Sequence, residues 1–247
     1  MKADGAPTRT DSGFARDGTY QVAGHTVTVT SLGTRDATTP VAYWIMMSRN
    51  GDESTAFTQL LAERTDHPLT LVACEVNNWD HELSPWPAGN ITGDDDFTGQ
   101  APELLGWLRE KCIPFVEGNA APAAARTRCI GGYSMAGLFS CWAFLSCDDF
   151  AGLANGSGSL WFPGWIEWAK GRCAPAGSVA YLSLGNKEPR VRNRQVATVG
   201  DATQALADAL AADPNVSQSA FVWNPGGHFN QPSERMADAI SWVVERL

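Results

Sequence analysis

The sequence predicts an α/β protein with a mainly parallel central sheet and helices on both faces. Three observations lead to this prediction: apolar runs of strand length recur, segments with helical spacing lie between them, and the two kinds alternate through the 247 residues. No internal repeat or low-complexity linker interrupts the alternation. We therefore expect one domain over residues 21–247, preceded by a flexible lead-in over residues 1–20.

The first elements follow from the spacing of apolar residues. HTVTVTSL, residues 25–32, alternates like a strand with one solvent-exposed face. VAYWIMM, residues 41–47, and LTLVACEV, residues 69–76, are continuous apolar runs, as expected for strands covered on both faces. Between these two runs, residues 54–64 have helical spacing, and Ser54 occupies the N-cap position.

The middle of the chain continues the alternation. Residues 97–111 are predicted to form a helix, and IPFVE, residues 113–117, is interpreted as a short strand. RCIGGYS, residues 128–134, has the apolar character of a strand, and the following segment 135–145 that of a buried helix. A short glycine-rich strand is expected over residues 152–159.

The last part of the chain repeats the pattern after a tryptophan-rich segment at residues 161–170. VAYLSLG, residues 179–185, is predicted as a strand and is followed by a helix over residues 199–212. SAFVWNP, residues 219–225, is the last predicted strand, and residues 232–247 form the closing helix. Because strands and helices alternate to the end, the predicted sheet is extended by parallel strands.

Composition and charge exclude several classes of function. The formal charge of −9 argues against nucleic acid or an anionic membrane as the main partner. No stretch approaches the roughly 20 apolar residues of a membrane helix, and the first residues lack the apolar core of a secretory signal. The six cysteines form no CxxC pair and no cluster with histidine, so we expect buried free thiols and no metal site. These features predict a cytoplasmic protein.

Ser134 stands in GGYSMAG, residues 131–137, between a predicted strand and a predicted helix. A serine at such a sharp turn is held in a strained conformation at the carboxyl edge of the sheet. The turn requires small neighbours, here Gly132 and Ala136, whereas the more familiar G-x-S-x-G pattern has glycine at both positions. The helix N-terminus favours negative charge on the serine oxygen. Ser134 is therefore a candidate nucleophile, although this motif alone is only moderately specific.

A serine hydroxyl needs a base to take its proton and an acid to orient that base. In this class of fold the order along the chain is serine, then aspartate or glutamate, then histidine. His228, in NPGGHFN, is the only histidine that follows Ser134, and it lies just beyond the last predicted strand. Glu188, which follows the strand before, is the predicted acid. Asp201 is its rival, but a position at the start of a helix suits a capping role.

With these residues placed, the chain resembles the α/β-hydrolases, and more narrowly the esterases related to esterase D and to the siderophore esterases. The resemblance covers nearly the whole chain from about residue 25. Besides the serine motif, its marks are WDHELSPWPAG (79–89), SGSLWFPG (157–164), LGNKEPRVRN (184–193) and GGHF (226–229). It implies the α/β-hydrolase fold, with Ser134 as nucleophile, His228 as general base and Glu188 as the orienting acid. The chain departs from the pattern in having Ala136 and a glutamate as acid.

The chain also lacks an HGG motif after the first central strand, where it has MMSRNG, residues 46–51. An oxyanion hole needs two donors aimed at the developing charge. One should be the backbone N–H of Met135, directly after the nucleophile. The second should come from residues 47–50. The prediction is a serine carboxylesterase that cleaves small esters through an acyl-enzyme, with no metal or organic cofactor.

Aromatic side chains are expected near this site. Trp79 and Trp161 each follow a strand end and are predicted to line the substrate pocket, although such residues could equally cover the top of the core. Basic residues near Glu188 are interpreted as a solvated or structural cluster, with binding of an anionic substrate group as the alternative: Lys187, Arg190, Arg192 and Arg194.

Two kinds of alternative function stay open. An acyltransferase or a small-peptide hydrolase would use the same three side chains, with a different acceptor or substrate. A non-catalytic binding protein could also be built on a hydrolase fold, because fold does not determine function. The partners expected are a small-molecule ester and, as one option, further copies of the same chain.

Overall fold

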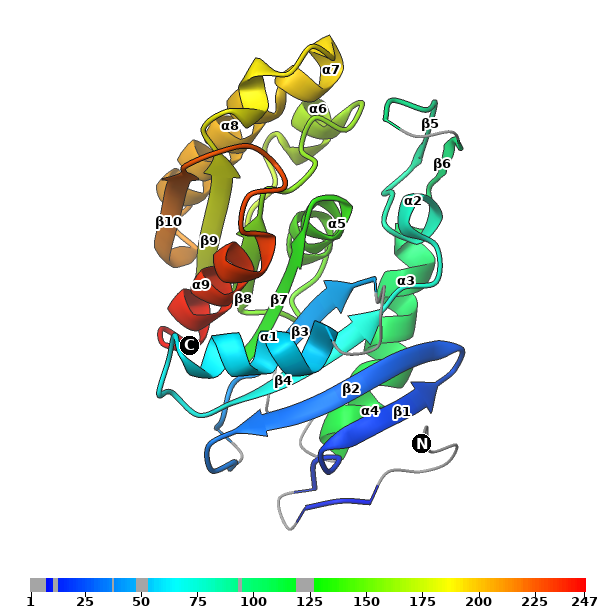
Figure 1. Ribbon diagram of the computed structural model, residues 1–247, viewed down its shortest axis with the longest axis vertical. Helices are drawn as coiled ribbons and strands as arrows, with labels where there is room; N and C mark the ends of the chain where they lie inside the picture. Colours follow the sequence, from blue (N-terminus) through cyan, green and yellow to red (C-terminus); the bar gives the residue numbers. More distant parts are fainter. Residues whose placement is uncertain (1–7, 11–12, 37, 48–52, 93–94, 119–126) are drawn as a thin grey trace.

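A computed structural model describes residues 8–10, 13–36, 38–47, 53–92, 95–118 and 127–247. Within these residues, eight strands form the central sheet (Figure 1). In order across the sheet they are β1 (Gly18–Val22), β2 (His25–Leu32), β4 (Leu69–Glu75), β3 (Val41–Met46), β7 (Arg128–Tyr133), β8 (Gly152–Gly156), β9 (Ser178–Gly185) and β10 (Val216–Asn224).

The sheet is mainly parallel, as predicted. Strand β3 pairs in parallel with β4 on one side and with β7 on the other, and parallel pairing continues through β8 and β9 to β10. At one edge the pairing is antiparallel, between β1 and β2 and between β2 and β4. A separate two-stranded ribbon is formed by β5 (Pro87–Ala88) and β6 (Phe97–Thr98). After β3, the chain adds β4 on one side and then β7 to β10 on the other, so the strand order reverses between β3 and β7.

Helices cover both faces of this sheet (Figure 1). The described helices are α1 (Glu53–Ala62), α2 (Trp79–Glu82), α3 (Ala101–Trp107), α4 (Ile113–Glu117), α5 (Met135–Phe144), α6 (Trp165–Ala169), α7 (Arg194–Ala197), α8 (Val199–Ala212) and α9 (Pro232–Val244). Helices α1 and α9 pack on one face, while α3, α5 and α8 contribute to the core on the other. None of the described helices combines the length and apolar character required to cross a lipid bilayer.

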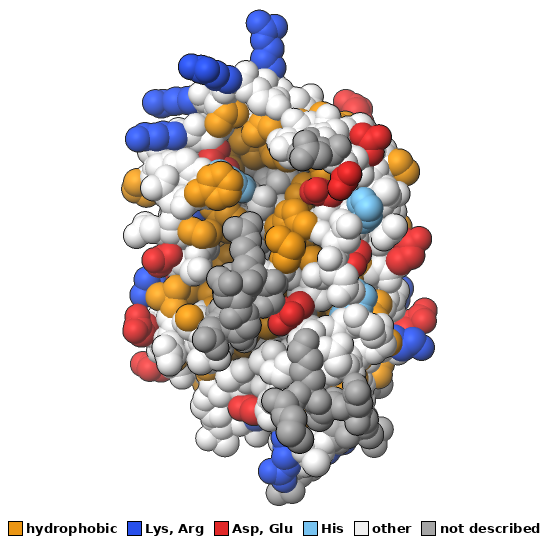
Figure 2. Space-filling model, turned by 45° about the vertical axis from the view of Figure 1, so that its right-hand side comes forward, with side chains coloured by type: hydrophobic (Ala, Val, Ile, Leu, Met, Phe, Trp, Pro, Cys, Tyr) orange, Lys and Arg blue, Asp and Glu red, His pale blue; other side chains and the backbone are white. Residues whose placement is uncertain are grey.

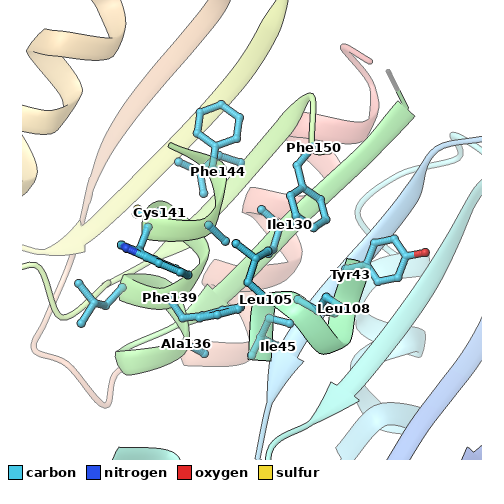
Figure 3. Close-up of a cluster of buried hydrophobic side chains, with 14 of the residues drawn as sticks. Tyr43, Ile45, Leu105, Leu108, Ile130, Ala136, Phe139, Cys141, Phe144 and Phe150 are labelled. Carbon is cyan, nitrogen blue, oxygen red and sulfur yellow. The ribbon is translucent and has the colours of Figure 1, made fainter. Parts of the chain in front are cut away.

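Alternate residues of the buried strands serve two separate cores, which explains their continuous apolar sequence. In β3, Tyr43 and Ile45 belong to the larger core with α5, whereas Ala42 belongs to the core under α1 and α9. All ten residues of α5 are buried. Figure 3 shows Phe139 and Phe144 of this helix beside Ile130 of the preceding strand. Helix α5 is therefore fixed from its first turn.

The segment 113–117 is a helix and not the predicted strand, and the predicted helix over residues 97–111 begins later, at Ala101. A π-helical turn (Leu108–Cys112) joins α3 to α4, and the backbone N–H of Ile113 donates to the carbonyl of Leu108. This wider turn lets the helix continue to Pro114, which has no N–H to donate. A short apolar run cannot be assigned to a strand or a buried helix by its pattern alone.

Within the stretch expected to be a flexible lead-in, residues 1–20, some of the described residues pack against the rest of the domain. Phe14 and Ala15 are fully buried, and the backbone N–H of Ala15 donates to the carbonyl of Val116 at 2.7 Å. Strand β1 then begins at Gly18 and pairs with β2. A single aromatic residue among polar neighbours was too weak a signal to predict this packing.

Candidate active site

Ser134 lies between β7 and α5, at the carboxyl edge of the sheet and next to the switch between β3 and β7. Ligands of open α/β sheets bind at such switch points. The backbone of Ser134 has φ of +61°, in the left-handed region that side chains other than glycine rarely adopt. Its N–H donates to the carbonyl of Gly156 at 3.1 Å, which helps to hold this conformation.

The turn around Ser134 is too crowded for larger residues. A Cβ atom on Gly132 would lie 2.6 Å from the backbone carbonyl carbon and oxygen of Ala136. A Cβ atom on Gly137 would lie 2.8 Å from the Cα atom of Gly158. Ala136 itself is fully buried at the start of α5. The structure thus accommodates alanine at the position where glycine is more familiar.

The three side chains predicted to act together are in hydrogen-bond contact. His228 Nε2 lies 3.0 Å from Ser134 Oγ, and His228 Nδ1 lies 2.8 Å from Glu188 Oε2. His228 follows β10, and Glu188 opens a 3-10 turn (Glu188–Arg190) after β9. The side chain of Glu188 is 6% exposed and that of His228 is 28% exposed. Asp201, the rival acid, lies exposed in the first turn of α8.

Glu188 is held as a carboxylate by several donors. Its Oε1 accepts from the hydroxyl of Ser157 and from the backbone N–H of Gly185, both at 2.7 Å. Burial by itself would raise the pKa of Glu188, but the hydrogen bond and charge of His228, with those of Ser157 and Gly185, outweigh it and hold the pKa below its usual value. The remaining oxygen, Oε2, is left to accept from His228.

This arrangement can move a proton from a serine hydroxyl to an imidazole. A buried carboxylate beside Nδ1 fixes the ring tautomer that leaves Nε2 free to accept, and it stabilises the imidazolium that results. Met135 is the first residue of α5, and N–H groups at the start of a helix have no partner within the helix. Its N–H is thus available for a negatively charged oxygen close to Ser134.

The site opens into a cavity of about 910 Å³. Trp79 and Trp161, the two predicted pocket residues, both line it. So does Met47, the first residue of the segment predicted to supply the second oxyanion donor; residues 48–50 lie outside the described part of the chain. Figure 2 shows hydrophobic side chains on both sides of a hollow in this face of the molecule.

Several residues of the site were not identified from the sequence. On the side of α1, the cavity is lined by Trp44, Ala56, Phe57 and Leu60. Ser159 Oγ lies 3.4 Å from Ser134 Oγ. Ser157 has a positive φ of 44°, a second strained position beside the site, although the motif SGSLWFPG had drawn attention to this stretch. Arg235 of α9 contacts Glu188 from the interior at 3.4 Å, and nothing in its local sequence pointed to this role.

Comparison with known proteins gives strong structural matches and weak sequence matches. No family model matches the chain. An uncharacterized protein, YbbA of Bacillus subtilis, is 29% identical over 126 residues, which are 49% of this chain and 50% of that protein. The chain therefore aligns with only about half the length of this curated relative.

Solved structures match over much more of the chain. The siderophore hydrolase EstA from Aspergillus nidulans has a TM-score of 0.73 at 18% identity, covering 96% of this chain and 97% of that one. An IroE-like serine hydrolase from Shewanella oneidensis has a TM-score of 0.71 at 16% identity, covering 90% and 76%. The enterobactin esterase FES from Shigella flexneri has a TM-score of 0.64 at 17% identity, covering 96% and 61%. These neighbours are α/β-hydrolases, and the chain has the α/β-hydrolase fold.

Proposed function

We propose that this protein is a carboxylic ester hydrolase in which Ser134 is the nucleophile, His228 the general base and Glu188 the acid that orients it. The observation that carries the proposal is one hydrogen-bonded line, 3.0 Å from Ser134 Oγ to His228 Nε2 and 2.8 Å from His228 Nδ1 to Glu188 Oε2. It lies in the lining of an apolar cavity of about 910 Å³. Nucleophile, base and orienting acid in contact are the requirements for acyl transfer through serine.

The proposed reaction has two steps. Ser134 Oγ attacks the ester carbonyl carbon while His228 accepts the hydroxyl proton, and the Met135 N–H donates to the negative oxygen that forms. The bond to the alcohol oxygen then breaks as His228 returns the proton to it, leaving the acyl group on Ser134. Water attacks this acyl-enzyme with His228 again accepting a proton. The carboxylic acid leaves, and Ser134 regains its proton.

The substrate class we propose is a bulky ester, in place of the small esters expected from the sequence. The cavity is large and mostly apolar, with indole rings from Trp44, Trp79 and Trp161 among its lining residues. Structural neighbours include siderophore hydrolases and an enterobactin esterase. A siderophore ester therefore belongs in the substrate panel beside simple esters.

The direct test measures hydrolysis of p-nitrophenyl acetate, butyrate and octanoate, and of enterobactin, by the wild type and by Ser134→Ala. We expect the variant to lose at least about 10³-fold in kcat, since it removes the attacking atom. Ser140→Ala is the matched control, because Ser140 is a buried serine of the helix that follows Ser134, and its hydroxyl donates to the carbonyl of Ala136. Wild-type hydrolysis no faster than that of Ser134→Ala on every ester would refute the proposal.

A further inference from the structure

We propose that Arg235 is the positioning residue of this site: its buried guanidinium ties the loop that carries His228 to the acid and to the strand before Ser134. The consequences for turnover rest on the proposed function, whereas the consequences for the His228 ring do not. Arg235 lies in the first turns of α9 and is only 3% exposed. Arginine can serve several acceptors at once because its five N–H donors form a rigid fork.

One nitrogen of Arg235 holds the loop backbone directly. Its Nη2 donates to the carbonyl of Pro225 at 3.1 Å and to that of Gly227 at 3.3 Å. These two carbonyls bracket the turn that leads from β10 into His228. From the other side of the loop, the N–H of Gly226 donates to Asn186 Oδ1 at 3.1 Å. The N–H of Lys187 also donates to the carbonyl of Gly226, at 3.0 Å. Arg235 thus supplies the attachment of this glycine-rich segment to α9.

A second tether runs through Tyr133. Arg235 Nη1 donates to the Tyr133 hydroxyl at 3.1 Å, and that hydroxyl donates to the backbone carbonyl of His228 at 2.5 Å. Tyr133 immediately precedes Ser134 in the chain. One guanidinium therefore links the backbone next to the base with the residue next to the nucleophile. Small displacements matter here, because a misplacement of about 1 Å can cost roughly 10²-fold in rate.

The third contact is with the acid. Arg235 Nη1 lies 3.2 Å from Ser157 Oγ and 3.4 Å from Glu188 Oε1. Glu188 Oε1 already accepts two shorter bonds, at 2.7 Å, from Ser157 and Gly185. Glu188 therefore keeps its place without Arg235. What Arg235 adds at this point is a positive charge that opposes the attraction of the carboxylate for a protonated His228 ring.

Substitution of Arg235 can separate two effects: the hold on the His228 loop and the positive charge near Glu188. Among the described residues, the titratable groups facing His228 are Glu188 from the 3-10 turn, Tyr133 from β7 and Arg235 from α9, and Asp80 also lines the cavity. Arg235 itself does not line the cavity. Removing it should therefore lower kcat with little change in KM. It should also make the imidazolium more favourable, so the acidic limb of the pH–rate profile moves to higher pH.

The experiment compares Arg235→Met and Arg235→Lys with the same substitutions at Arg128. Arg128 is the matched control because it is also 3% exposed and pairs with a carboxylate, Glu117, at the far end of β7. We expect Arg235→Met to lower kcat about 10- to 100-fold per folded molecule, with KM within about threefold. Arg235→Lys keeps the charge, so its acidic limb should stay at the wild-type pH while kcat falls less. The Arg128 variants should lose stability but keep kcat per folded molecule.

A measurement that needs no substrate accompanies the kinetics. The chain has four histidines, so the His228 ring signal can be assigned in NMR spectra by its absence from His228→Gln. Its titration midpoint should be higher in Arg235→Met than in the wild type, and should stay in place in Arg128→Met. This result is expected even if the wild type hydrolyses no ester, which would refute only the proposed function.

Two results would show that Arg235 does not position the site. Wild-type kcat and an unmoved His228 titration in folded Arg235→Met would overturn this role. So would a loss of activity that only follows the folded fraction measured by circular dichroism, as in the Arg128 variants. If Arg235→Met does not fold, the test uses kcat of Arg235→Lys and of Tyr133→Phe. The phenylalanine removes only the hydroxyl group that links Arg235 to the His228 carbonyl. Unchanged kcat in both of these variants would equally overturn the role of Arg235.

Discussion

At the scale of single residues, Glu188 shows how a buried carboxylate is kept charged. It is 5% exposed, yet hydrogen bonds from His228, Ser157 and Gly185 hold its pKa below the ordinary value of 4.5 against the opposing effect of burial. A carboxyl group whose pKa is lower in the folded state stabilises that state above its ordinary pKa. This stabilisation is lost as the pH falls through the lower, folded-state value.

We therefore predict that Glu188→Gln lowers the free energy of unfolding by about 1–3 kcal/mol at pH 7, because the donors lose a charged acceptor. The difference from the wild type should shrink as the pH falls below about 4.5, the ordinary pKa of a glutamate. Urea unfolding of both proteins at pH 7, 5 and 4 measures this difference. Glu110→Gln, at an exposed glutamate, is the control. A difference that stays constant with pH would contradict the assignment.

Some residues of this site could be predicted from their sequence context and others could not. Ser134 and His228 follow strands and have glycines within two residues, and Glu188 follows the strand between. Their order along the chain therefore predicted the contact that the structure shows. Arg235 carries no such signal. In the sequence it is one charged residue in an amphipathic helix, where a solvent-exposed position is the usual expectation. Its burial depends on where α9 lies against β7 and β9, which is a tertiary property.

At the scale of elements, the turn between β7 and α5 depends on backbone contacts. The atoms that a Cβ on Gly132 would meet first are the carbonyl carbon and oxygen of Ala136, at 2.6 Å, followed by its Cβ at 2.7 Å. Backbone atoms in the first turn of a fully buried helix cannot move aside. The strained φ of Ser134 therefore depends on the absence of a side chain at residue 132.

We predict that Gly132→Ala abolishes ester hydrolysis and lowers the free energy of unfolding by about 1–3 kcal/mol, as overpacking does. Ala136→Gly should retain activity and cost only about 1 kcal/mol, the helix penalty of glycine. The double variant should remain inactive, because the contact with backbone atoms persists. Ester hydrolysis and thermal unfolding of all three variants test this prediction. An active double variant would contradict it, because it would show that the added methyl group clashes only with the Ala136 side chain.

Long helices and the strands of the parallel sheet were predicted from the sequence, whereas the shortest helices were not. The predicted helix over residues 199–212 coincides with α8, and the strand over residues 25–32 coincides with β2. In contrast, α2, α6 and α7 have only four or five residues. A helix of this length completes little more than one turn, so no periodicity can be recognised. The helical segment 113–117 was also missed. It has only five residues, and the π-helical turn before it breaks the regular helical spacing.

At the scale of the whole molecule, one end of the parallel strands carries the candidate active site and the other end carries a buried ionic cluster. At the end opposite Ser134, Glu117 is fully buried and accepts from Arg128 at 2.7 and 2.8 Å and from the hydroxyl of Tyr43 at 2.7 Å. This cluster joins the end of α4 to β3 and β7. With six residues in β7, it lies about 20 Å from the site. It should therefore affect stability and not catalysis.

We predict that Glu117→Gln lowers the free energy of unfolding by about 3–5 kcal/mol, because it removes the carboxylate that is hydrogen-bonded to the buried Arg128 guanidinium. Adding Arg128→Met should recover part of this loss, since replacing both members of a buried ion pair by uncharged groups is often close to neutral. Urea unfolding measures both variants, and kcat/KM per folded molecule should match the wild type. A loss of activity beyond the unfolded fraction would show that this end of the sheet communicates with the site.

The strained turn at residue 134 also has a consequence for protein synthesis. The histidine and the arginine that complete its surroundings lie at residues 228 and 235, after three further strands of the sheet have been made. A growing polypeptide thus carries the serine long before it carries His228, the base in the proposed reaction. Interrupted translation products that end before β10 should be inert toward esters even where their first strands have folded, so reactivity would arise only late in the life of the nascent chain.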